Sequence, residues 1–261
     1  MSTYVHTLAY NTPNMVRDAV RSLTMLNKGV KYEHLLIDLE YPLDDEHWDK
    51  IPDNIEAIKD KNYYRNQVTA FEFHSHFCQL ENVGVSQNWT QAAKWFGLQD
   101  TDVLICADPD ERPQNEGWVK AIADVIAADP RIGWVSMMMK EQQPLIDSGN
   151  YLCEEADIAG HRCYKMRSLF NWAQGGFNGR FINEAGGVPY PHGAKRYGWI
   201  ETACMEKFSE LGYYYVILAD YYVEHIASSP LAGEWKVFIT SNQTIDGTQM
   251  SFEDWLGMKR Q

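Results

Sequence analysis

The chain lacks any hydrophobic run long enough to cross a membrane, because no stretch approaches about 18 consecutive apolar residues. Residues 1–11 contain no basic region followed by an apolar run, so we expect no signal peptide and a cytoplasmic location. The five cysteines are odd in number and show no CxxC spacing, which disfavours a disulfide framework or a zinc site. Low-complexity tracts and repeats of solenoid period are also absent, which disfavours a repeat protein.

Positive charge is scarce: 23 Lys and Arg stand against 36 Asp and Glu, for a net charge of -13. A large surface for nucleic acid is therefore disfavoured, because polyanion binding depends on Lys and Arg neutralising phosphates. A local basic cleft stays open. An enzyme of this charge that binds an anionic ligand needs a cation or a few well-placed basic groups.

Length and composition are those of a globular protein: 261 residues, of which 45% are hydrophobic and 23% charged. A chain of this length can bury a sizeable core in one large domain. We expect a single domain over residues 1–225 and a short C-terminal extension over residues 226–261, which acts as a brace or a lid.

The first half of the chain alternates strand and helix. Tyr4–Ala9 is a short apolar run, and Thr12 and Pro13 then suit the start of a helix that Gly29 ends. A second buried strand follows at His34–Asp38. This order predicts a βαβ unit, with two parallel strands and a right-handed crossover.

The alternation continues along the chain and predicts an α/β fold with a mixed central sheet flanked by helices. A second helix carries Val85, Trp89, Ala92, Ala93 and Phe96, and Val103–Ala107 is wholly apolar, as a central parallel strand should be. Pro113 is expected to open the next helix. Further elements are expected as a strand at Gly133–Met139, a helix at Trp199–Leu211, and strands at Tyr213–Leu218 and Tyr222–His225.

Asp108 and Asp110 follow the apolar strand Val103–Ala107 directly. Ligands of open α/β sheets bind outside the carboxyl ends of the strands, and two carboxylates on one loop suit Mg²⁺ or Mn²⁺ together with phosphate. By itself the pair is a weak signal, because about five acid-x-acid matches arise by chance in a chain with this many acids. The strand before it strengthens the prediction of a metal site.

Two more residues fit a site at the strand ends. His225 ends the last clear strand, although a lone histidine is more often structural. Glu201 lies at the head of a helix, where the helix dipole stabilises a carboxylate; the ordinary interpretation is a first-turn acid.

Taken in order, these segments resemble the GT-A fold glycosyltransferases, particularly the family-two type. The matching segments are Tyr4–Asn11, His34–Asp38, Glu81–Gly84, Asp108–Asp110, Gly186–Gly187 with Tyr197–Glu201, and His225. The second strand departs from the family, because Ile37–Pro42 lacks the usual Asp-Asp-Gly-Ser run.

The resemblance implies a transferase that moves a sugar from a nucleoside diphosphate-sugar to an acceptor hydroxyl, of a carbohydrate or another molecule, and inverts the anomeric centre. It implies Asp108, Asp110 and His225 as ligands of Mn²⁺ or Mg²⁺, and Glu201 as the general base. The donor would contact Thr7, Tyr10, Asn11, Asp38, Asn82, Gly84 and Asp108.

Additional side chains are candidates beside the resemblance. Arg180, Lys195 or Arg196 could add positive charge near the phosphates, or lie on the surface. Four aromatic residues have two possible roles, stacking on a sugar or packing in the core. They are Trp172, Phe177, Tyr190 and Trp199.

Three alternatives stay open. Nucleotidyl transfer uses a related layout, but it predicts a Gly-rich basic loop after the first strand, and residues 11–14 are not one. A non-catalytic module that binds nucleotide-sugars or carbohydrates is the second. A transferase that acts on a modified nucleic-acid base is the third, which the acidic net charge disfavours.

Overall fold

The computed structural model describes residues 1–10, 13–39, 75–79, 85–139, 142–149, 151–167, 172–190 and 200–225. For some of these, Tyr10, Asp38 and His225 among them, only the backbone is described. Asn11, Asn82, Gly84, Lys195, Arg196, Trp199 and the extension 226–261 lie outside the described residues.

The N-terminal half is built as the apolar pattern predicts. The strand β1 (Thr3–Tyr10), the helix α1 (Pro13–Leu26) and the strand β2 (Glu33–Leu39) form a βαβ unit in which β1 and β2 are parallel. The helix α4 (Val85–Phe96), the strand β4 (Val103–Ala107), the helix α5 (Trp118–Ala128) and the strand β6 (Ile132–Met139) follow. Every residue of β4 is buried, as its uniform hydrophobicity requires.

The remaining described elements include one long strand and several short segments. They are β3 (Ser75–Gln79), β5 (Glu111–Pro113), α6 (Gln143–Asp147), β7 (Cys153–Ile158), β8 (His161–Met166), β9 (Gly175–Asn178), α7 (Gly179–Ala185), α8 (Ile200–Leu211) and β10 (Tyr214–His225).

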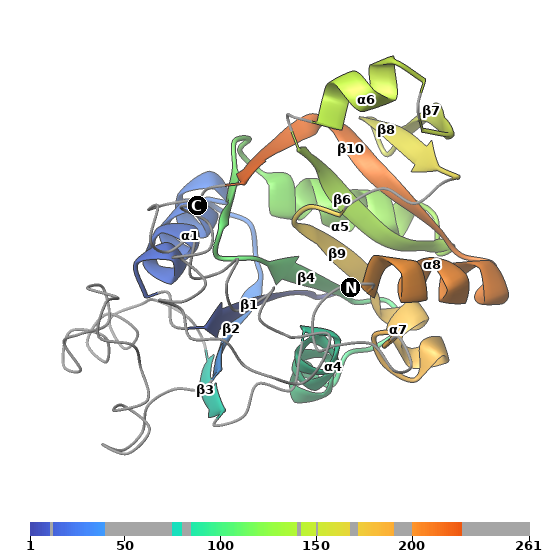
Figure 1. Ribbon diagram of the computed structural model, residues 1–261. Helices are drawn as coiled ribbons and strands as arrows, with labels where there is room; N and C mark the ends of the chain where they lie inside the picture. The colour runs from blue at the N-terminus through green and yellow to red at the C-terminus, as the bar shows by residue number, and fades with distance from the viewer. Residues whose placement is uncertain are drawn as a thin grey trace, which may run out of the picture.

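One mixed sheet runs through the molecule (Figure 1), with the strand order β3-β2-β1-β4-β9-β6-β10-β8-β7 and β5 paired to β10. Strands β3, β2, β1 and β4 are parallel. Because β9 is antiparallel to both β4 and β6, and β10 is parallel to β6, these last two strands run in the direction of β4. The expected α/β fold with a mixed central sheet flanked by helices is confirmed.

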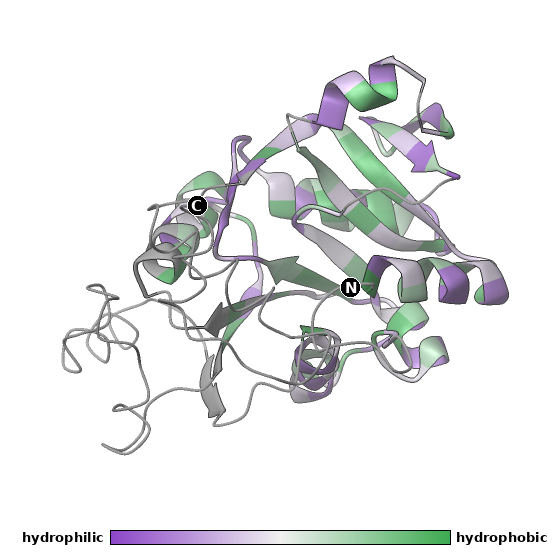
Figure 2. Ribbon diagram, in the orientation of Figure 1, coloured by the Kyte–Doolittle hydropathy of each residue, from purple (hydrophilic) through white to green (hydrophobic). Residues whose placement is uncertain are grey.

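Helices cover both faces of the sheet. Helix α5 packs Trp118, Ile122 and Val125 against one face, together with Val5 of β1. Helices α4, α7 and α8 pack against the other face, through an aromatic cluster that includes Phe181. Figure 2 shows the apolar colour along β4 and in the part of β10 that lies beside β6, and hydrophilic residues on α8. None of the helices in the described ranges combines the length and the hydropathy that a membrane span requires.

The central strand β9 depends on its glycines. A Cβ on Gly175 would lie 2.2 Å from the carbonyl oxygen of Val135 and 2.6 Å from the ring of Trp134. A Cβ on Gly179, just after the strand, would lie 2.1 Å from the carbonyl oxygen of Gln99. Only glycine therefore allows β9 to lie between β4 and β6.

Two expectations about element boundaries are wrong. Pro113 does not open a helix: it ends β5 and pairs with Val223, and α5 begins five residues later, after Gly117 in a left-handed conformation with φ of 69°. A proline suits this place because a strand end does not need its missing N–H. The two expected strands near the C-terminal end of the sheet form one strand, β10, whose register shifts between Leu218 and Tyr222.

Candidate functional site

The parallel strands bring several of the predicted residues to one edge of the sheet. Because β1, β2, β4, β6 and β10 share a direction, their carboxyl ends meet at the same edge. Tyr10 ends β1, Asp38 is the last residue but one of β2, Asp108 follows β4, and His225 ends β10. The chain therefore places these four positions at the edge where α/β proteins bind ligands, and their individual roles stay predictions.

The Asp108–Glu111 segment is a tight turn with defined backbone contacts. The N–H of Glu111 donates to the carbonyl oxygen of Asp108 at 3.2 Å, and Pro109 occupies the second position, where its fixed φ suits a turn. The guanidinium of Arg112 donates to the carbonyl oxygens of Pro109 and Glu111. The side chain of Asp110 is buried, at 5% exposure, and that of Asp108 is half-buried. The two carboxylates are thus carried on a constrained turn.

The end of β10 lies beside this turn. Strands β5 and β10 are antiparallel, with His225 opposite Glu111 and Glu224 opposite Arg112. Facing Cα atoms in such a pair are about 4.5–5.5 Å apart. His225 is consequently a close backbone neighbour of the residue that follows Asp110.

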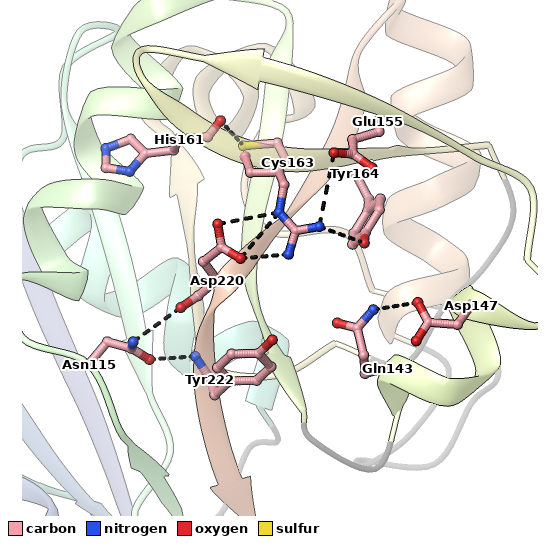
Figure 3. A network of polar contacts seen from close by, with 10 residues as sticks. Asn115, Gln143, Asp147, Glu155, His161, Cys163, Tyr164, Asp220 and Tyr222 are labelled. Atoms are coloured by element: carbon pink, nitrogen blue, oxygen red, sulfur yellow. Dashed lines mark hydrogen bonds and ion pairs between the residues drawn. The ribbon is translucent and has the colours of Figure 1, made fainter.

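A polar network fixes the irregular middle of β10 (Figure 3). Asn115 donates to the carbonyl oxygen of Asp220 at 3.1 Å and accepts from the N–H of Tyr222 at 2.7 Å, so one amide spans the register shift. The guanidinium of Arg162 in β8 contacts the carboxylate of Asp220, with its shortest N–O distance at 2.6 Å. These contacts set the register in which β10 reaches β5.

Helix α8 points its first turn toward the same edge. Its last residue, Leu211, leads within three residues to Tyr214, which begins β10 and pairs with Ile132 at the start of β6. The helix therefore ends at the amino edge of these strands, and its beginning, with Glu201, lies toward the carboxyl edge. A helix N-terminus stabilises a carboxylate there.

Two buried thiols link the acids of the turn to those of α8. Burial raises the pKa of Cys106 well above its usual value, and the charge of Asp108 and the thiol of Cys204 add to the shift. Burial likewise raises the pKa of Cys204, with a smaller contribution from Glu201. Electrostatic effects of this kind require proximity. Cys106 is therefore near Asp108 and Cys204, and Cys204 is near Glu201.

The donor set suits a hard divalent cation only in part. Within the described ranges, no group of three or more His, Cys, Asp or Glu side chains is arranged to hold a metal ion. Mg²⁺ and Mn²⁺ bind through one or two carboxylates plus substrate phosphates, which is what Asp108 and Asp110 on one turn can offer. The residues fit a cation that takes further ligands from a bound diphosphate.

Other predicted residues lie elsewhere. Thr7 is 1% exposed, and its hydroxyl lies 2.9 Å from Nε2 of the buried His34. This contact joins the strands β1 and β2 within the sheet. Its assignment to the donor stays a prediction. Arg180 lies two residues after Asn178, which pairs with the first residue of β4. Because β9 is antiparallel to β4, Arg180 lies toward the opposite edge of the sheet, which favours the interpretation of a surface residue over that of a residue near the phosphates.

Core packing accounts for two of the aromatic candidates. Phe177 is fully buried, and Trp172 is 9% exposed and stacks on Trp134 with ring centroids 4.7 Å apart. Stacking on a sugar is thus not their role. Tyr190 is half-buried, and its role stays a prediction.

Sequence reasoning missed two residues around the turn, Glu111 and Asn115. Glu111 is buried at 5% exposure, and its carboxylate accepts from the N–H of Gln174. Its only signal in the sequence was its place directly after Asp110. Asn115 gave no signal, because its partners lie 105 and 107 residues away.

Comparisons with solved structures agree with this architecture. TarS of S. aureus, residues 1–349, matches 92% of this chain and 64% of its own at 17% identity, with a TM-score of 0.51. A longer TarS structure matches 97% of this chain and 41% of its own at 16% identity, with the same TM-score of 0.51. This protein has a GT-A-like fold.

At these low sequence identities, the likeness shows a shared fold and does not show a shared activity. The chain spans 64% of the length of the shorter TarS structure. No family model matches the chain, and no curated protein matches it.

Proposed function

We propose that the protein transfers a sugar from a nucleoside diphosphate-sugar to an acceptor hydroxyl. The observation that carries the proposal is the constrained Asp108–Asp110 turn, at the carboxyl edge of a GT-A-like sheet and beside the end of β10. The donor would lie over the ends of β1, β2 and β4, and the acceptor over the side where α8 begins. On this proposal residues 1–225 form the transferase domain and residues 226–261 its brace or lid.

Asp108 and Asp110, with His225, are the residues that would hold the divalent cation. A cation bound there supplies positive charge that stabilises the departing diphosphate, an effect worth several kcal/mol. The turn contributes by holding two carboxylates in place before the donor binds. Preorganised charge of this kind needs no rearrangement during the reaction.

Glu201 is the proposed general base. The acceptor oxygen attacks the anomeric carbon, the bond from that carbon to the diphosphate oxygen breaks, and the hydroxyl proton passes to the Glu201 carboxylate. Attack from the face opposite the diphosphate inverts the anomeric centre. The position of Glu201 in the first turn of α8 supports this role, because a carboxylate is favoured at a helix N-terminus.

The proposal is tested by incubating the protein with UDP-, GDP- and dTDP-linked sugars and Mn²⁺, and measuring the free nucleotide released. We expect slow release from one donor in water and faster release when a carbohydrate acceptor is added. Donor binding without release from any donor would indicate a non-catalytic binding module. Formation of a nucleotide-sugar and pyrophosphate from nucleoside triphosphate and a sugar or sugar phosphate would indicate nucleotidyl transfer.

Cytoplasmic location stays a prediction from the sequence.

A further inference from the structure

Glu111 is a buried acid that makes a specific bond to the main chain. It follows Asp110 directly, begins β5 and is 5% exposed. Its Oε2 atom accepts a hydrogen bond from the N–H of Gln174, the residue before β9. A bond from a backbone N–H to a carboxylate is charge-assisted and therefore stronger than a neutral one.

This bond ties the turn to the centre of the sheet. The carbonyl oxygen of Gln174 accepts a hydrogen bond from the N–H of Met137 in β6 at 2.9 Å. The main chain of Gln174, whose N–H donates to Glu111, is therefore itself bonded to β6. The N–H of Glu111 closes the turn by donating to Asp108. Glu111 thus connects the turn, the β9 segment and, through its pairing with His225, the end of β10.

We propose that Glu111 is a positioning residue that holds the Asp108–Asp110 turn in the geometry required for cation binding. The inference rests on the proposed function, because it concerns the same site. Glu111 acts through hydrogen-bond geometry: its carboxylate anchors one end of the turn, and without the anchor the two aspartates lose their fixed separation. Groups that orient metal ligands commonly change metal affinity 10- to 100-fold when they are removed.

The chain offers a matched control, Asp102, at the end of β4 that lies away from the turn. Asp102 is also 5% exposed and also accepts main-chain hydrogen bonds, from Ser2 at 2.7 Å and from Gln99 at 3.1 Å. It precedes β4, whereas Glu111 follows the turn after β4. Replacing either acid removes a buried anchor, but only Glu111 lies next to the proposed ligands.

The test measures binding of Mn²⁺ alone to the full chain, from the electron paramagnetic resonance signal of free Mn²⁺. We expect Glu111→Ala to weaken Mn²⁺ binding at least about tenfold. Glu111→Gln should stay within about threefold of the unsubstituted protein, because its amide oxygen can still accept from Gln174. Asp102→Ala should lower the unfolding temperature without changing Mn²⁺ affinity. If Glu111→Ala does not fold, Glu111→Asp replaces it; its carboxylate is one methylene short of Gln174, and the same weakening is expected.

Failure of this inference and failure of the proposed metal site give different results. If Asp110→Asn loses Mn²⁺ binding while Glu111→Ala, or Glu111→Asp in its place, binds as tightly as the unsubstituted protein, Glu111 is not a positioning residue. Equal weakening in Glu111→Ala and Glu111→Gln would also overturn the inference, because it would assign the effect to charge. If the unsubstituted protein binds Mn²⁺ and Asp110→Asn binds it equally tightly, the metal site itself is wrong. If the unsubstituted protein does not bind Mn²⁺ without a donor, the inference is overturned, because it requires a turn that is preformed for the cation.

Discussion

Replacing Asp110 by alanine is expected to abolish metal-dependent sugar transfer while the protein stays folded. The substitution removes one of the two carboxylates on the turn, and with it the charge stabilisation that a cation gives to the leaving diphosphate. A loss of about 4 kcal/mol corresponds to roughly a 1,000-fold slower reaction. The measurement is the rate of transfer as a function of Mn²⁺ concentration, together with the unfolding temperature.

A surface acid provides the control for Asp110. Asp124 lies on α5, where it forms an exposed ion pair with Lys120 at 2.5 Å, and Asp124→Ala should leave transfer unchanged. Asp110→Asn, which keeps the side-chain volume, should lose activity like Asp110→Ala if the charge is what matters. Full activity in a folded Asp110→Ala protein would remove the metal assignment.

Glu201→Gln is expected to keep donor binding and lose turnover. The amide cannot accept the proton of the acceptor hydroxyl, and general-base catalysis typically contributes about 100- to 10,000-fold. The donor should still bind, because Glu201 lies on the first turn of α8 and not on the donor strands. Steady-state kinetics with separate measurement of kcat and of the donor Kd tests this expectation.

Glu206→Gln is the matched control for Glu201, because both acids lie on α8 and Glu206 is exposed. The control should behave like the unsubstituted protein. Unchanged kcat in Glu201→Gln would remove Glu201 from the role of base. A weaker donor Kd with an unchanged kcat would instead move Glu201 to donor binding.

The sequence predicted those parts of the fold whose hydrophobic pattern is regular. Strand β4 is apolar throughout and buried throughout, and α5 shows the helical spacing of Trp118, Ile122 and Val125. The βαβ unit at the N-terminus follows from the same patterns. The edge position of Asp108 could be predicted as well, because a residue after a parallel strand must lie at its carboxyl end.

Long-range pairing explains what the sequence could not predict. Strand β9 contains two adjacent glycines that suggest a loop, yet the narrow space between β4 and β6 requires them. Pro113 resembles a helix start until its pairing with Val223 is known. Phe177 and Trp172 carry no sign in the sequence of whether they face a ligand or the core. The role of Glu111 depends on Gln174, 63 residues away.

Donor binding with and without Mn²⁺ tests the central claim most directly. The unfolding temperature of the protein would be measured with a panel of nucleoside diphosphate-sugars, in Mn²⁺ and in a metal chelator. We predict that one donor raises the unfolding temperature only when Mn²⁺ is present, since a ligand at 100 times its Kd stabilises the folded state by about 2.7 kcal/mol. Asp110→Asn should lose that increase. An equal increase in the chelator, or no increase with any donor, would contradict the account.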